Sequence, residues 1–120
     1  MKKALIIDDE KRTRDLIAKM VNSMGLGVEA FPDGENVKSG IEAIERLHPD
    51  IVFMDIQMPD GTGFDILRSI DNKNFEVIFT QDSNAYYFDK DVLEKIVSNL
   101  LSNAFKYTSK KKQYKFSNPY

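Results

Sequence analysis

The chain has 120 residues, of which 42% are hydrophobic and 30% charged, and this composition is typical of one small globular domain. Its net charge of −2 gives no electrostatic reason to expect nucleic-acid binding, and the absence of cysteine excludes disulfides and thiolate metal sites. No apolar run approaches the ~20 residues of a membrane span, and acidic residues follow the first apolar run too closely for a secretory signal. We therefore expect a single cytoplasmic domain that does not contact membranes.

The first eighty residues alternate between strand-like apolar runs and apolar residues at helical spacing. Strands are predicted over residues 4–7, 28–31, 51–54 and 75–79, and helices over 16–24, 37–47 and 64–70. This alternation predicts an α/β fold, a parallel sheet with helices on both faces. The runs 4–7 and 51–54 are almost wholly apolar, as central strands should be, whereas Glu29 places the second strand at an edge. Pro32-Asp33-Gly34 predicts a turn.

The composition changes after Thr80. Residues 81–85 are polar, and an amphipathic helix is predicted over 92–105, with Asp91 and Glu94 as its capping box. We divide the chain into a core (1–82), an atypical segment whose helix packs on that core (83–108) and a basic tail (109–120). Residues 113–116 are a candidate fifth strand. Without it, the strand that ends at Thr80 is an exposed edge that invites pairing with another chain.

Three carboxylates follow the two central strands. Asp8 and Asp9 come after the strand at 4–7, and Asp55 comes after the strand at 51–54. Neighbouring parallel strands end at the same edge of a sheet, so these side chains should converge, and a hard divalent cation such as Mg²⁺ would relieve their repulsion. The main-chain carbonyl of Gln57 is a candidate further ligand, and Thr80 could place a hydroxyl near the same point. The residues suggest magnesium-assisted chemistry on a phosphate, with an aspartate as nucleophile.

A structural explanation competes with this functional one, because acidic residues after strands are often turn formers or helix caps. Asp9 could cap the first helix, and Asp60 belongs to a turn. For any single aspartate the structural explanation is better, but for the three together the functional one is. His48, the only histidine, lies at a predicted helix end, where we expect a surface or capping role and no catalysis.

Two stretches resemble the receiver domain of bacterial two-component response regulators, in the form that precedes a LytTR DNA-binding domain: ALIIDDEK (4–11) and PDIVFMDIQMPDGTGFD (49–65). The resemblance covers residues 3–80 and implies a flavodoxin-like sheet. It implies that Asp55 accepts a phosphoryl group from the phosphohistidine of a sensor histidine kinase. Asp8 and Asp9 would position Mg²⁺, with Asp55 and the Gln57 carbonyl as further ligands, and Thr80 would be the switch hydroxyl.

The last third departs from this family. Receivers carry a lysine at the end of a fifth strand, usually followed by proline, but this sequence has no Lys-Pro pair. Lys106 falls at about the right distance from Thr80, yet within a helix-like segment. Residues 89–108 instead resemble the N-box helix of histidine-kinase ATP-binding domains, with Asn99 and Asn103 at its polar positions. The glycine-rich boxes and phosphoacceptor histidine of a kinase are missing, so we interpret the segment as a recombined piece recruited as a packing helix.

Three functions compete on these grounds. The first is a phosphoacceptor signalling module, and the second is a degenerate receiver that acts as a phosphate sink or a protein-interaction scaffold. The third, an ATP-binding enzyme, needs parts that this chain lacks, and an aspartate phosphatase would want an Asp-x-Asp pair where Asp8 and Asp9 are adjacent. We expect no enzymatic turnover. The expected partners are a sensor histidine kinase and either a downstream protein or a second copy, since no DNA-binding domain follows.

Overall fold

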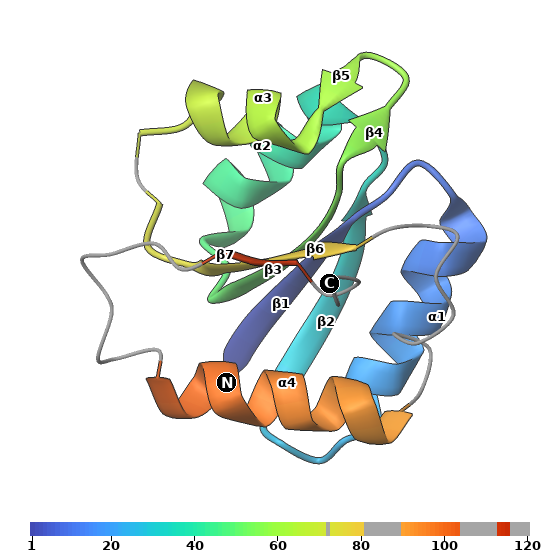
Figure 1. Cartoon of the computed structure of the whole chain (residues 1–120), viewed down its shortest axis with the longest axis vertical. Helices are drawn as coiled ribbons and strands as arrows, with labels where there is room; N and C mark the ends of the chain where they lie inside the picture. The colour runs from blue at the N-terminus through green and yellow to red at the C-terminus, as the bar shows by residue number, and fades with distance from the viewer. Residues whose placement is uncertain (72, 81–89, 104–112, 116–120) are drawn as a thin grey trace.

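The computed structural model describes residues 1–71, 73–80, 90–103 and 113–115. Five parallel strands form one sheet in the order β2-β1-β3-β6-β7, and a small hairpin, β4–β5, stands apart from it (Figure 1). This strand order is that of flavodoxin-like folds, so the expected fold class is confirmed. The strands are β1 (Lys2–Ile7), β2 (Val28–Gly34), β3 (Ile51–Asp55), β4 (Gln57–Met58), β5 (Gly61–Thr62), β6 (Glu76–Thr80) and β7 (Gln113–Lys115). The helices are α1 (Lys11–Asn22), α2 (Val37–Leu47), α3 (Gly63–Ser69) and α4 (Lys90–Asn103).

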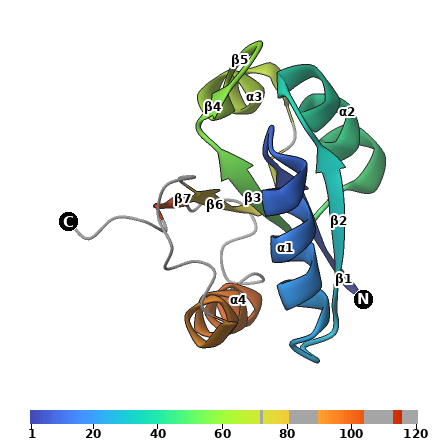
Figure 2. The same cartoon turned by 90° about the vertical axis from the view of Figure 1, so that its right-hand side faces the viewer.

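Helices cover both faces of the sheet (Figure 2), and an apolar cluster lies on each face. On one face α1 and α4 pack against β1 and β3, with Ile17 and Val97 fully buried. On the other face α2 and α3 pack against the alternate residues of the same strands, with Ile66 fully buried. Because β1 and β3 are covered on both sides, their apolar runs have no polar alternation, as the sequence indicated.

The predicted edge position of β2 is confirmed, but the predicted turn at Pro32-Asp33-Gly34 is wrong. These residues belong to β2, which reaches Gly34 and pairs with Ile7 after a register shift. An edge strand tolerates proline because one side of its backbone needs no partner. Gly34 is required there by close approach, since a Cβ at this position would lie 2.7 Å from Cγ1 of Ile7.

The ends of α2 are fixed by three polar residues. Asn36 caps its first turn and accepts a hydrogen bond from the Ser39 amide. Asp60, in the turn between β4 and β5, accepts hydrogen bonds from the amides of Val37 (2.8 Å) and Lys38 (3.2 Å). His48 ends the helix in the left-handed conformation (φ 50°) and is exposed, which agrees with its predicted capping role. Asp60 therefore does more than form a turn, because it attaches the hairpin to α2.

The contacts of Asp60 predict a pH-dependent stabilisation. The Val37 amide, and then the Lys38 amide, lower the pKa of Asp60 below its usual 3.8. The stabilisation is therefore complete above about pH 4 and is lost as pH falls through the lowered pKa. We expect Asp60→Ala to lower the Tm by about 2–5 °C at pH 7 and by progressively less below pH 3.8. Thermal denaturation followed by circular dichroism measures this, with the exposed Asp71→Ala as the control; an equal loss at pH 7 and pH 2.5 would contradict it.

In the last third, α4 begins at Lys90, so Asp91 lies inside its first turn and the predicted capping position of Asp91 is wrong. The candidate fifth strand is present as β7, which pairs in parallel with β6, so β6 is not an edge. Lys106, and the predicted end of the helix at Phe105, lie outside the described residues. Within the part of the chain that the structure describes, no helix has the length and apolar character to cross a membrane.

Candidate functional site

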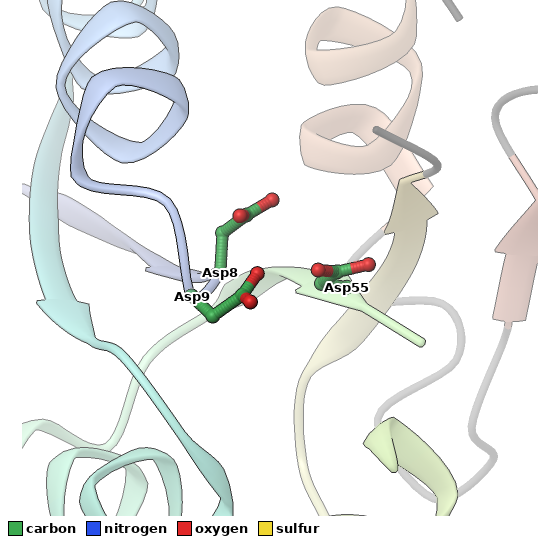
Figure 3. A group of neighbouring side chains, drawn as sticks. All are labelled: Asp8, Asp9 and Asp55. Carbon is green, nitrogen blue, oxygen red and sulfur yellow. The ribbon is translucent and has the colours of Figure 1, made fainter. Parts of the chain in front are cut away.

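Asp8, Asp9 and Asp55 form one cluster at the carboxyl edge of the sheet (Figure 3). One carboxylate oxygen from each lies within 4.8 Å of the others. The strand register explains this proximity, because Ile7 pairs with Met54 and the next residues are therefore level with each other. The chain leaves β1 and β3 toward opposite faces of the sheet, so the cluster lies at the topological switch point, where α/β folds bind ligands.

The cluster is buried to an unusual degree for a group of acids. Asp8 is 1% exposed and Asp55 is 6% exposed, whereas Asp9 faces solvent. Bringing two largely desolvated carboxylates together with a third is costly unless a cation or a proton compensates their charge. Three carboxylate oxygens are the donor set that Mg²⁺, Ca²⁺ and Mn²⁺ prefer. The side chains therefore fit a hard divalent cation.

The position of Asp8 is supported by two neighbours. Its Oδ1 accepts a hydrogen bond from the Glu10 amide at 2.9 Å. The guanidinium of Arg14 donates from Nη1 to the main-chain carbonyl of Asp8 at 2.7 Å, and its Nη2 lies 4.0 Å from Glu35. Arg14 is 9% exposed and was missed by the sequence reasoning. The sequence did contain a signal for it. Arg14 lies three residues before Ile17, so a charged residue falls on the apolar face of α1.

The position of Asp55 depends on a close contact with Gly63, the first residue of α3. A Cβ on Gly63 would lie 2.7 Å from the carbonyl oxygen of Asp55 and 2.9 Å from the sulfur of Met54. The Gly63 amide also donates to the carbonyl of Ile56 at 2.8 Å. The helix thus begins directly against the main chain of Asp55, and only glycine fits there without displacement.

The remaining predicted site residues lie near this edge. Thr80 ends β6, pairs in register with Asp55 and is 2% exposed. Gln57 begins β4, two residues after Asp55, and pairs with Thr62 across the hairpin. Lys115, which the sequence analysis did not single out, ends β7 and pairs with Phe79, the residue before Thr80. The strand ends therefore bring the aspartates and Thr80 to one edge, while the use of the Gln57 carbonyl as a ligand stays a prediction.

Two of the sequence relatives carry names of regulatory proteins. A response regulatory protein of Vibrio parahaemolyticus is 38% identical over 84 residues, which are 69% of this chain and 34% of that protein. The transcriptional regulatory protein LytR of Staphylococcus aureus is 39% identical over 64 residues, 53% of this chain and 26% of that protein. The chain spans about a third of the length of the curated relatives it matches.

Solved structures share the fold at low identity. The response regulator TrrA of Thermotoga maritima, solved in complex with Mg²⁺-BeF, has a TM-score of 0.67 and 23% identity, over 83% of this chain and 99% of that one. The response regulator domain of Thermotoga maritima CheB has a TM-score of 0.70 and 18% identity, over 88% of this chain and 97% of that one.

A family model for the response regulator receiver domain matches residues 4–111. The match covers most of the chain and extends past Thr80 into the segment where the sequence pattern departs from the family. Together with the fold and the aspartate cluster, it shows that this chain belongs to the response regulator receiver domain family of two-component systems.

Proposed function

We propose that the chain accepts a phosphoryl group on Asp55 from a sensor histidine kinase, in a reaction that requires Mg²⁺, and does so in the cytoplasm. The observation that carries this proposal is the cluster itself: three carboxylates within 4.8 Å, two of them buried, at the switch point of a receiver fold. Receiver domains are phosphoacceptors, so a chemical step on one of these aspartates is expected and enzymatic turnover is not.

In the proposed step, a carboxylate oxygen of Asp55 attacks the phosphorus of the kinase phosphohistidine. The new O–P bond forms as the P–N bond breaks, and the electron pair returns to the imidazole nitrogen, which takes a proton. Asp55 is the candidate because it ends the central strand β3 and its main chain is held by Gly63. Thr80, level with Asp55 on β6, would place its hydroxyl on the transferred group.

The metal would be held by Asp8, Asp9 and Asp55, with the main-chain carbonyl of Gln57 as a further ligand. When bound, Mg²⁺ supplies positive charge that offsets the charge of the carboxylates and of the phosphoryl oxygens. The contact of Arg14 with the Asp8 carbonyl and the Glu10 amide on Asp8 Oδ1 would hold this ligand in place. The structure of TrrA with Mg²⁺-BeF supports the same chemistry by relationship.

We further propose that Lys115 is the cation of the fifth strand that the family resemblance implies. Lys115 ends β7, and β7 lies directly beside β6, in register up to Phe79. In that role Lys115 would couple the phosphoryl group to neighbouring elements, so Lys115→Met should leave labelling of Asp55 largely intact but reduce the spread of amide shifts from the site into α4. Two-dimensional NMR of the phosphorylated protein measures this. Lys95→Met, an exposed lysine of α4, is the control; identical spreads in both variants would exclude Lys115.

A degenerate receiver, a phosphate sink or scaffold without output, is the second candidate function. The departure of the last third from the family pattern favours it, because the elements next to the site differ there. The resemblance of residues 89–108 to an N-box helix, and that of residues 3–80 to receivers that precede a LytTR domain, stay proposals about the origin of the chain. A downstream protein partner also stays a proposal. An ATP site is not proposed, since one helix cannot enclose a nucleotide.

Phosphate transfer tests the proposed function directly. The full chain is incubated with acetyl phosphate, with Mg²⁺ and with Mg²⁺ removed by EDTA, and its mass is measured intact. We expect the added mass of one phosphoryl group with Mg²⁺, at least tenfold less without it, and its loss on treatment with hydroxylamine, which cleaves acyl phosphates. Absence of labelling at any Mg²⁺ concentration would overturn phosphoacceptance, and labelling without spread of NMR shifts would favour the degenerate receiver.

A further inference from the structure

The connection from β6 to β7 differs in hand from the other three connections of the sheet. Within the described residues, β1 runs to β2 in one direction along the sheet with α1 on one face. The steps from β2 to β3 and from β3 to β6 run in the opposite direction, with α2 and α3 on the other face. A crossover keeps its handedness when both its direction along the sheet and the face of its helix are reversed. These three connections therefore have the same handedness.

The fourth connection, from β6 to β7, differs from the third in the face that carries its helix but not in its direction along the sheet. The step from β6 to β7 continues in the direction of the step from β3 to β6, but α4 lies on the face of α1 (Figure 2). Parallel crossovers are right-handed in about 98% of cases, because a right-twisted strand followed by a helix packs back onto the sheet in that hand. The three connections of the same handedness are therefore the right-handed ones, and the crossover through α4 is left-handed.

The helix of this connection is nevertheless packed on the sheet, and its strand is paired with β6. Leu93 and Val97 of α4 are 1% and 0% exposed against the α1 face, so the helix is held by the core of its own sheet. Val77, Ile78 and Phe79 of β6 are also at most 1% exposed, and they pair in register with the three residues of β7. The unfavourable feature is therefore only the requirement that one chain supply α4 and then β7 to the same sheet.

We propose that β7 is exchanged between two copies of the chain, so that β6 of each copy pairs with β7 of the other. The handedness rule applies to a connection that returns to its own sheet, and exchange removes that connection while keeping the same strand pairing and register. Residues 104–112, between α4 and β7, can span about 30 Å when extended, which allows β7 to reach a second sheet. Exchange of an identical element is a low-cost route to a dimer. The second copy then supplies the strand that ends one position from Thr80.

Cysteine cross-linking distinguishes exchange from self-pairing, because the natural chain has no cysteine. Val77 and Gln113 are register partners across β6 and β7. One full-length chain carries only Val77→Cys and a second carries only Gln113→Cys; they are refolded together and oxidised. We expect a covalent dimer that contains one chain of each kind, and a doubling of native mass from 13.8 kDa for the unmodified protein at high concentration.

Two controls keep this result specific. Glu42→Cys, an exposed position on α2, replaces Val77→Cys in the mixture and reports random collisions. Tyr114→Pro removes the central donor of β7 and should return the native mass to that of a monomer. The proposal is overturned if a chain carrying both Val77→Cys and Gln113→Cys oxidises to a monomer while the mixed single variants cross-link no more than the Glu42 control. A mass of one chain at all concentrations would overturn it as well.

Discussion

Asp55→Asn should abolish phosphorylation by acetyl phosphate, with a loss of at least a hundredfold in labelled protein. The amide that replaces the carboxylate has the same shape but lacks the charge and the nucleophilic oxygen that would form the acyl phosphate. Asp55 is 6% exposed and lies within 4.8 Å of Asp8 and Asp9 through carboxylate oxygens, so the substitution changes the chemistry at the centre of the cluster. Intact-mass measurement after incubation with Mg²⁺ and acetyl phosphate checks the prediction.

The same substitution carries a second signature. Removing one of three clustered carboxylates relieves repulsion in the metal-free protein, so Asp55→Asn should raise the free energy of unfolding by about 1–2 kcal/mol without Mg²⁺. Stabilisation by added Mg²⁺ should decrease, because one ligand charge is lost. Asp71→Asn, an exposed aspartate outside the cluster, is the matched control and should change neither quantity. Persistent labelling of Asp55→Asn at the wild-type rate would exclude Asp55 as the acceptor.

Gly63→Ala should both destabilise the fold and impair the site. The added methyl would lie 2.7 Å from the carbonyl oxygen of Asp55, and a main-chain atom of the last residue of a central strand cannot move away easily. Overpacking of this kind costs about 1–3 kcal/mol. Relief of the contact requires a shift of α3 or of the end of β3, so labelling of Asp55 should fall several-fold even at temperatures where the variant is folded. Urea denaturation and labelling kinetics measure the two effects separately.

Gly25→Ala is the control for stability alone. Gly25 has a φ of 69°, and a methyl group on its Cα would have no heavy atom within 4 Å, so alanine there strains the backbone without touching the site. The left-handed conformation costs a non-glycine residue about 1–2 kcal/mol, which is similar to the loss expected for Gly63→Ala. If the two variants lose stability equally and label Asp55 equally, the contact between Gly63 and Asp55 does not position the acceptor.

The parts of the fold that the sequence predicts well are those fixed by burial on both faces. The apolar runs of β1 and β3 have no solvent-facing alternative, and their ends locate Asp8 and Asp55 once the strands are parallel neighbours. The turn predicted at Pro32-Asp33-Gly34 failed because its residues continue an edge strand, where proline is tolerated and Gly34 fits against Ile7. The turn preferences of these three residues could not predict the tertiary contact between Gly34 and Ile7.

Other features lie beyond what the residue pattern can specify. The hairpin β4–β5 has two residues in each strand, too few for a periodic signal, although its Pro-Asp-Gly turn was evident. Arg14 and Gly63 support the site through main-chain carbonyls, and such contacts depend on geometry between distant elements. The amphipathic pattern of α4 predicts that one face is buried, but not against which side of the sheet. That choice sets the hand of the last crossover.

Amide NMR of the full chain with Mg²⁺, before and after addition of beryllofluoride as a mimic of the acyl phosphate, tests whether the aspartate cluster is a phosphoacceptor site. We expect shifts at Asp9, Asp55 and Thr80, because Asp9 shares the carboxylate cluster with Asp55, the proposed acceptor, and Thr80 pairs with Asp55 in register. A working switch adds shifts in α4 and β7, while shifts confined to the strand ends indicate a receiver that binds without signalling. A spectrum that does not change at Asp55 would contradict the assignment of this cluster as a phosphoacceptor site.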